Sequence, residues 1–127
     1  MKNASILVVD DFKTVINIVR RQLSSVGYDD IDEAMCGEEA LEKIHNRKYD
    51  LIISDWNMDR MSGLDLLCEV RKDEDCKDIP FIMITSDNKL SKNISASRAG
   101  VSEFVTKPSS ASYLESKISK VLEDRVA

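Results

Sequence analysis

The sequence predicts an α/β fold, in which five parallel strands form one sheet with helices on both faces. Three observations lead to this prediction. Short runs that are almost wholly apolar alternate with longer amphipathic segments, which is typical of strands covered on both faces of a parallel sheet. The alternation occurs five times. The chain has 127 residues, which suits one such unit. We therefore expect a single domain over residues 1–127, a doubly wound (βα)5 sheet.

Five segments are expected to form the strands. Three of them are apolar at nearly every position and are the strong candidates, at residues 6–9, 51–53 and 81–84. Two weaker candidates include charged residues, at 30–34 and 103–105. Each strand is followed by a segment with helical character, so right-handed crossover connections join the strands into a parallel sheet.

Five helices are expected, with the bounds 13–26, 38–47, 64–72, 91–99 and 111–125. Gly27 and Gly100 follow two of them, because glycine readily takes the left-handed conformation that ends a helix. The helix at 91–99 is polar and only weakly periodic. The apolar faces of the others are expected to bury Val15, Val19, Leu23, Val26, Ala40, Leu41, Ile44, Leu64, Leu67, Cys68, Leu114, Ile118, Val121 and Leu122. Ser112 and Glu115 have the spacing of a capping box, although Ser109 or Ser110 could cap the last helix instead.

Composition argues against several classes of partner. The formal net charge is −5 and no long run of Lys or Arg occurs, so neither nucleic acid nor an anionic membrane is expected to bind. No apolar stretch reaches membrane-spanning length and the N-terminus does not resemble a signal peptide, so we expect a cytoplasmic protein without membrane insertion. Cys36, Cys68 and Cys76 lack metal-binding spacing and are expected to be reduced structural thiols.

Polar residues follow four of the expected strands where each strand ends: Asp10-Asp11, Ser54-Asp55, Thr85-Ser86 and Thr106-Lys107-Pro108. Ligands of doubly wound sheets bind at the carboxyl ends of the strands, so these side chains should meet at one edge. Three carboxylates held together repel one another unless a cation lies between them, and oxygen ligands alone favour Mg²⁺. Lys107 and Thr85 would suit the oxygens of a phosphoryl group.

These motifs resemble the receiver domains of two-component signalling, and the resemblance covers almost the whole chain. It rests on Val8-Val9-Asp10-Asp11, Asp55, Thr85-Ser86 and Lys107-Pro108, in this order. The stretch Asp55-Trp56-Asn57-Met58, with Gly63 after it, is similar to the chemotaxis (CheY-like) branch, as is Asp10-Asp11-Phe12. The resemblance implies the strand order 2-1-3-4-5.

The resemblance also implies roles for individual residues. Asp55 would accept a phosphoryl group from a histidine kinase, and Lys107 would pair with the phosphoryl oxygens. Mg²⁺ would be held by Asp11, Asp55 and the backbone carbonyl of Asn57, with Asp10 acting through a water molecule. Thr85 and Phe104 would form the switch, and Asn57 and Asp87 would tune the phosphoryl lifetime.

Three positions depart from the family pattern. Asp59-Arg60 replaces the usual proline after Met58, so this loop loses a conformational restraint beside the site. Ser109 stands where phenylalanine is frequent, and Phe104 lacks the hydroxyl of the commoner tyrosine.

The expected function is that of a stand-alone response regulator, not an enzyme, that assists its own phosphorylation and autodephosphorylation. Its output face would comprise the helix at 91–99, the strand at 103–105 and the helix at 111–125, with a flagellar motor switch protein as the favoured target. A phosphorelay intermediate, a phosphate sink and a phosphorylation-independent binding module are the alternatives.

Two other classes on related architectures fit less well. A phosphatase of the haloacid-dehalogenase class needs an acid two residues after its nucleophile, where this chain has Asn57. A flavodoxin-like carrier would suffer repulsion between Asp10-Asp11 and the flavin phosphate. His45, the one histidine, is expected to be an exposed residue near a helix end and not a phosphodonor.

Overall fold

The computed structural model describes residues 3–86, 97–107 and 110–126, without the side chains of residues 124–126. The strands are β1 (Ile6–Val9), β2 (Ile31–Ala34), β3 (Leu51–Asp55), β4 (Phe81–Thr85) and β5 (Glu103–Thr106). The helices are α1 (Lys13–Ser25), α2 (Gly37–Asn46), α3 (Gly63–Lys72) and α5 (Ala111–Val126), and residues 97–99 are also helical. Most of the helix expected at 91–99 lies outside the described residues, as do Asp87, Pro108 and Ser109.

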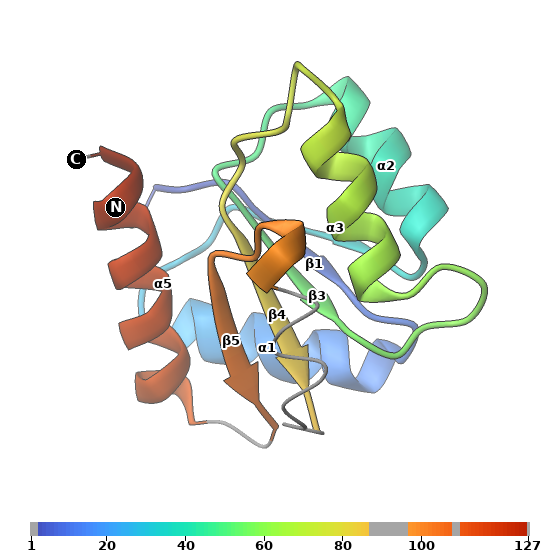
Figure 1. Ribbon diagram of the computed structural model, residues 1–127. Helices are drawn as coiled ribbons and strands as arrows, with labels where there is room; N and C mark the ends of the chain where they lie inside the picture. Colours follow the sequence, from blue (N-terminus) through green and yellow to red (C-terminus); the bar gives the residue numbers. More distant parts are fainter. Residues whose placement is uncertain (1–2, 87–96, 108–109, 127) are drawn as a thin grey trace.

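The five strands form one parallel sheet in the order β2-β1-β3-β4-β5, which confirms the expected fold (Figure 1). The order reverses between β1 and β3, because β1 pairs with β2 on one side and with β3 on the other. In doubly wound sheets the functional site lies at this switch point, beyond the carboxyl ends of the strands.

Two hydrophobic cores lie on the two faces of the sheet. Along β1 the side chains alternate, so that Ile6 and Val8 join the core under α1 and α5, while Leu7 and Val9 join the core under α2 and α3. Figure 1 shows α1 and α5 on one face and α2 and α3 side by side on the other. Burial on both faces explains why the central strands are apolar at almost every position.

The buried faces of the helices agree only in part with the sequence prediction. In α5 the four expected residues are all buried: Leu114, Ile118, Val121 and Leu122. Four expected residues are half-buried and pack against the cores: Val15, Val26, Leu41 and Leu64. Cys68 is also half-buried, and the sequence prediction missed the buried Ile16 of α1 and the buried Leu66 and Val70 of α3. Both helices carry apolar residues on more than one face, so the way each helix lies on the sheet selects which of them are buried.

The helix ends have specific caps. Ser110 caps α5, since its Oγ accepts a hydrogen bond from the N–H of Tyr113 at 3.1 Å. The capping box expected from Ser112 and Glu115 is therefore wrong, and the alternative at Ser110 is confirmed. Gly27 and Gly100 take the expected left-handed conformation, with φ of 101° and 93°.

A polar network ties together the amino-terminal ends of the strands. The Arg47 guanidinium donates to Asp30 Oδ2 at 2.6 Å and to Asp32 Oδ2 at 2.7 Å, and the Tyr49 hydroxyl donates to the same Asp32 oxygen at 2.6 Å. The hydroxyl of Ser5, which donates to Asp30 Oδ2 at 2.7 Å, and then Arg47 lower the pKa of Asp30. The bonds from Tyr49 and Arg47 lower the pKa of Asp32, and burial together with Asp32 raises the pKa of Tyr49 to about 12. The network joins β2 to the segment before β3.

Among the described residues, no helix has the length and apolar character needed to cross a membrane.

Candidate functional site

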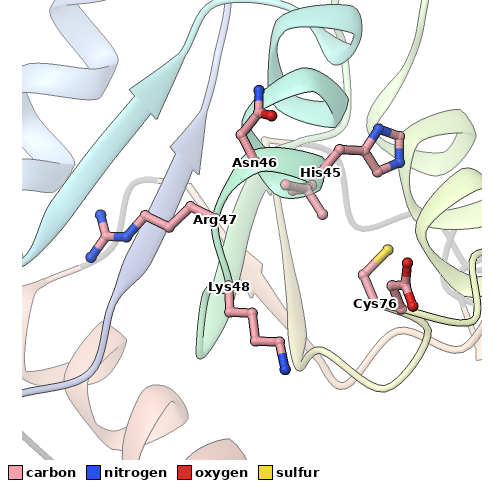
Figure 2. A pocket seen from close by; sticks show the side chains of 7 residues that line it. His45, Asn46, Arg47, Lys48 and Cys76 are labelled. Carbon is pink, nitrogen blue, oxygen red and sulfur yellow. The ribbon is translucent and has the colours of Figure 1, made fainter.

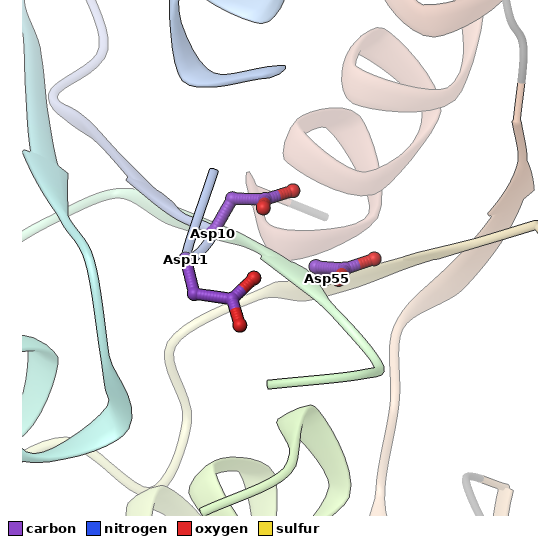
Figure 3. A group of neighbouring side chains, drawn as sticks. All are labelled: Asp10, Asp11 and Asp55. Carbon is purple, nitrogen blue, oxygen red and sulfur yellow. The ribbon is translucent and has the colours of Figure 1, made fainter. Parts of the chain in front are cut away.

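Three carboxylates meet at the switch point of the sheet. Asp10 and Asp11 follow β1, Asp55 ends β3, and one oxygen from each lies within 4.8 Å of the others (Figure 3). Asp10 and Asp55 are buried, and Asp11 is half-buried. Among the described residues, this is the one group of three or more acidic, histidine or cysteine side chains with the proximity of a metal site. The three acids predicted from the strand ends are thus brought together.

Backbone hydrogen bonds hold two of these acids in place. The Asp10 N–H donates to the Ala34 carbonyl at 3.1 Å, which continues the pairing of β1 with β2. The Phe12 N–H donates to Asp10 Oδ1 at 2.9 Å and orients that carboxylate. On the other strand, the Trp56 N–H donates to the Ile84 carbonyl at 3.0 Å directly after Asp55. The sheet therefore sets the separation of the acids.

Lys107 supplies the positive charge of the site. Its Nζ lies 2.9 Å from Asp55 Oδ1 and 3.4 Å from Asp10 Oδ2, although 97 positions separate Lys107 from Asp10. The backbone N–H of Lys107 donates to the Thr85 carbonyl at 2.8 Å, and this bond fixes the backbone from which the Lys107 side chain extends. Burial alone would lower the pKa of the Lys107 ammonium. Its hydrogen bonds and electrostatic attraction to Asp55 and Asp10 outweigh burial, so the pKa is raised. Lys107 is therefore a permanent cation.

The charges of the site do not balance within the protein. Burial raises the pKa of Asp10, and repulsion by Asp55 adds to this, although the hydrogen bond from Phe12 and the ammonium of Lys107 act in the opposite direction. Three carboxylates face one ammonium. A divalent cation would remove this excess of negative charge.

The residues present fit Mg²⁺. The donors are all carboxylate oxygens, which a hard cation prefers. Asp11 Oδ1 is buried and has no hydrogen-bond partner among the described residues. A buried carboxylate oxygen without a partner is costly, and coordination to a cation would satisfy it. Asn57 is exposed two residues after Asp55, at the same edge of the sheet.

The two residues expected to form the switch lie on neighbouring strands. Thr85 ends β4 and is fully buried, and Phe104 is half-buried in β5. The Phe104 ring packs against Trp56, with centroids 6.0 Å apart and an interplanar angle of 29°. The sequence prediction treated Trp56 and Phe104 separately and missed this contact, which no local pattern could reveal.

Two features at the start of α3 were not predicted from the sequence: a capping box and the close packing of Gly63. Ser62 and Asp65 form a capping box, in which each side chain accepts a bond from the other's backbone N–H at 3.1 Å. The spacing of serine and acid was visible in the sequence. A Cβ added to Gly63 would lie 2.7 Å from Met83 Sδ and closer still to the carbonyl oxygen of Asp55. Glycine is thus required where α3 meets the phosphoacceptor candidate.

A hollow lies at the end of α2, between the segments that precede β3 and β4, at the opposite edge of the sheet from the acids (Figure 2). Its lining includes His45, Asn46, Arg47, Lys48 and Cys76. His45 is exposed, as expected, and its Nε2 lies 2.9 Å from Asp73 Oδ2. Burial and the nearby Asp73 and Asp75 raise the pKa of Cys76, so its thiol stays protonated. All three cysteines are free.

Comparisons with known proteins agree with this geometry. Residues 6–119 match the model of the response regulator receiver domain. Chemotaxis protein CheY-3 of Vibrio cholerae is 40% identical over 122 residues, which are 96% of this chain and 94% of that protein. Chemotaxis protein CheY of Pseudomonas aeruginosa is 42% identical over 118 residues, or 93% and 95% of the two chains.

A solved structure of chemotaxis protein CheY4 from Vibrio cholerae superposes with a TM-score of 0.88 at 30% identity, covering 94% of this chain and 98% of that one. The shared fold, the acid cluster at the switch point and the similarity over nearly the full length lead to one conclusion. The chain belongs to the response regulator receiver family of two-component signalling and is closely related to the CheY chemotaxis regulators.

Proposed function

We propose that this response regulator is switched by phosphorylation of Asp55, with a histidine kinase as phosphodonor and Mg²⁺ as cofactor. The observation that carries the proposal is the position of Asp55, whose carboxylate lies beside those of Asp10 and Asp11 and 2.9 Å from the Lys107 ammonium. Phosphoryl transfer depends mainly on positioning and on neutralising the charge of the phosphoryl oxygens, and this site can do both. All of residues 1–127 would form the one receiver domain.

In the transfer step, an Asp55 carboxylate oxygen forms a bond to phosphorus while the bond from phosphorus to the imidazole nitrogen of the donor breaks. The Lys107 ammonium already lies beside Asp55, and the backbone N–H of Lys107 is bonded to the Thr85 carbonyl, so the ammonium can donate hydrogen bonds to the phosphoryl oxygens without a large rearrangement. Mg²⁺ would be held by Asp11, Asp55 and the carbonyl of Asn57, with Asp10 acting through a water molecule. When bound, it supplies charge neutralisation for the incoming phosphoryl group.

The response to phosphorylation would pass through Thr85 and Phe104. A phosphoryl group adds charge and three acceptor oxygens at the carboxyl ends of β3 and β4. The arrangement in which Thr85 and Lys107 both bind these oxygens gains stability, so its population rises. Phe104 lies in β5, which pairs with β4 in register at Thr85 and Thr106. The output face would include β5 and α5 and the helix that precedes β5.

The partner class follows from the relatives. The matched proteins from Vibrio cholerae and Pseudomonas aeruginosa are named as chemotaxis proteins, so we propose a role in chemotaxis with a flagellar motor switch protein as target. Asn57 and Asp87 are proposed to tune the phosphoryl lifetime. The chain would assist its own phosphorylation and autodephosphorylation and would have no separate substrate.

Trp56 provides the test, because it directly follows Asp55 and is the chain's one tryptophan. Its emission would be followed while MgCl₂ and then acetyl phosphate are added, with Asp55→Asn as the control. We expect a saturable change with Mg²⁺ and a second change that is absent from Asp55→Asn. A phosphoprotein gel gives an independent readout. If neither MgCl₂ nor acetyl phosphate changes the Trp56 emission and no phosphoprotein appears on the gel, the protein is better explained as a binding module that acts without phosphorylation.

A further inference from the structure

The loop between β3 and α3 connects directly to the site, and the structure indicates how it is held. It begins after Asp55, carries Asn57, and ends at Ser62 before α3. Residues 59 and 60 are Asp and Arg, so no proline ring restrains the backbone at these two positions. Hydrogen bonds and packing must therefore hold the backbone that leads away from Asp55.

The loop contains a strained turn. Arg60 has φ of 65°, in the left-handed region that residues other than glycine rarely adopt. The N–H of Met61 donates to the carbonyl of Asp59 at 2.7 Å, so the turn closes over three residues. Such strain persists only where the surrounding structure imposes it. The exposed ion pair between Arg60 and Glu38, at 3.8 Å, is too weak to do so.

The restraint comes from packing at both ends of the loop. At its end, the N–H of Gly63 donates to the Trp56 carbonyl at 2.8 Å. On the other side, Met61 lies over Gly37, the first residue of α2. A Cβ on Gly37 would lie 2.7 Å from Met61 Cγ and 3.0 Å from Met61 Cβ, with Sδ closer still. Because Cβ and Cγ are the atoms of Met61 nearest its backbone, rotation about the outer bonds of the side chain could not relieve this overlap.

We propose that Gly37 and Met61 are positioning residues for the metal site: the missing side chain of Gly37 forms a notch in α2 that seats Met61 and so anchors the loop that carries Asn57. This inference rests on the proposed function, because it assigns the loop a role in Mg²⁺ binding. Neither residue touches the cation. Their effect is to keep the backbone between Asp55 and Met61 in one conformation, so that the ligands need not be ordered when the cation binds.

The experiment measures Mg²⁺ affinity and folding stability in the same variants. MgCl₂ alone is titrated against Trp56 emission, and against melting temperature as a second readout, for the unmodified protein, Gly37→Ala, Met61→Ala and the double variant. Gly100→Ala is the matched control. It forces alanine into a left-handed position near Arg71, at the other edge of the sheet, and should lower stability without changing the Kd for Mg²⁺.

We expect Gly37→Ala and Met61→Ala each to raise the Kd for Mg²⁺ by about three- to tenfold, a weaker effect than loss of a group that contacts a ligand directly. Alanine stabilises a helix more than glycine does. If Gly37→Ala binds Mg²⁺ more weakly or is less stable, the cause must therefore be the overlap with Met61. The double variant should then bind about as well as Met61→Ala alone, because the overlaps with Sδ and Cγ are gone and only the approach to Cβ at 3.0 Å remains.

Two results would overturn the inference while the proposed function stands: a Kd unchanged in both single variants despite lower stability, or strictly additive effects in the double variant. Met61→Ala introduces no overlap, so it remains informative if Gly37→Ala does not fold. If the unmodified protein itself shows no response to MgCl₂ by either readout, the proposed metal site is wrong and the inference fails with it.

Discussion

The rings of Trp56 and Phe104 lie with their centroids 6.0 Å apart and their planes inclined by 29°. Trp56 directly follows Asp55 at the end of β3, and Phe104 lies in the edge strand β5. With β4 between the two strands, this contact is a side-chain link from the acid site to the edge of the sheet. Any displacement of Phe104 would therefore change the environment of Trp56.

Phe104→Leu should destabilise the protein by about 1 to 2 kcal/mol, because it removes the ring contact and part of the buried apolar surface. The Trp56 emission spectrum should shift in the folded state. Urea unfolding followed by circular dichroism measures the loss. Phe12→Leu is the control, since Phe12 is 65% exposed and its replacement should stay within about 0.5 kcal/mol. Equal losses in the two variants would contradict a specific role for the Trp56 contact.

Asp11→Ala should stabilise the metal-free protein by about 1 kcal/mol, because it removes repulsion among the three acids and a buried oxygen that has no partner in the described part of the chain. Mg²⁺ at about 100 times its Kd should stabilise the unmodified protein by about 2.7 kcal/mol. The same concentration should have little effect on Asp11→Ala. Thermal unfolding with and without MgCl₂ measures both quantities.

Asp59→Ala is the matched control for this experiment, because Asp59 is an exposed acid in the adjacent loop. It should leave metal-free stability within about 0.5 kcal/mol and retain the response to Mg²⁺. If Asp59→Ala stabilises the protein as much as Asp11→Ala, the effect reflects only the net charge of the chain.

Gly63→Ala should destabilise the protein by about 2 kcal/mol. Alanine gains at most about 1 kcal/mol over glycine in a helix. Against this, the added Cβ would overlap the Asp55 carbonyl oxygen and Met83 Sδ, and the carbonyl cannot yield without moving β3. Chemical denaturation decides which term is larger. A gain in stability would mean that β3 and α3 can separate at no cost.

Tyr49→Phe should cost about 1 kcal/mol near pH 7, because it removes the hydroxyl bond to Asp32. That bond, more than any other contact, lowers the pKa of Asp32 below the ordinary value of 3.8. A carboxyl group whose pKa is lowered by folding contributes stability above its unfolded pKa and loses it as the pH falls through the folded value. The difference between the two proteins should therefore shrink below about pH 4.

Urea unfolding at a series of pH values measures this dependence. At high pH the same bond acts in the opposite sense, because the pKa of Tyr49 is raised from 10.0 to about 12 and its contribution is lost as the pH rises through that range. Tyr113→Phe is the control for loss of an exposed tyrosine hydroxyl, since Tyr113 lies in α5 and is 43% exposed. A difference that stays constant from neutral to acid pH would show that Asp32 is not involved.

Much of the fold could be predicted because its signals are local. The apolar runs at residues 6–9, 51–53 and 81–84 are the cores of β1, β3 and β4, and the weaker candidates at 30–34 and 103–105 contain β2 and β5. The position at which a strand ends can also be recognised from neighbouring residues, so Asp10, Asp11 and Asp55 could be expected together at the carboxyl edge of the sheet. The errors lie in the helices, where the prediction missed the buried Leu66 and Val70 of α3, while Leu64 and Cys68 are only half-buried.

The order of the elements, the polar residues that follow the strands and the family that they indicate could all be inferred from the amino-acid sequence. These depend on periodicities of two and 3.6 residues and on residue types at segment ends. Three contacts are visible only in the folded chain: Lys107 lies 2.9 Å from Asp55, Trp56 packs on Phe104, and Met61 lies in the notch at Gly37. Those distances join segments far apart in the chain, and they depend on how each helix and loop packs on the sheet, which no local pattern specifies.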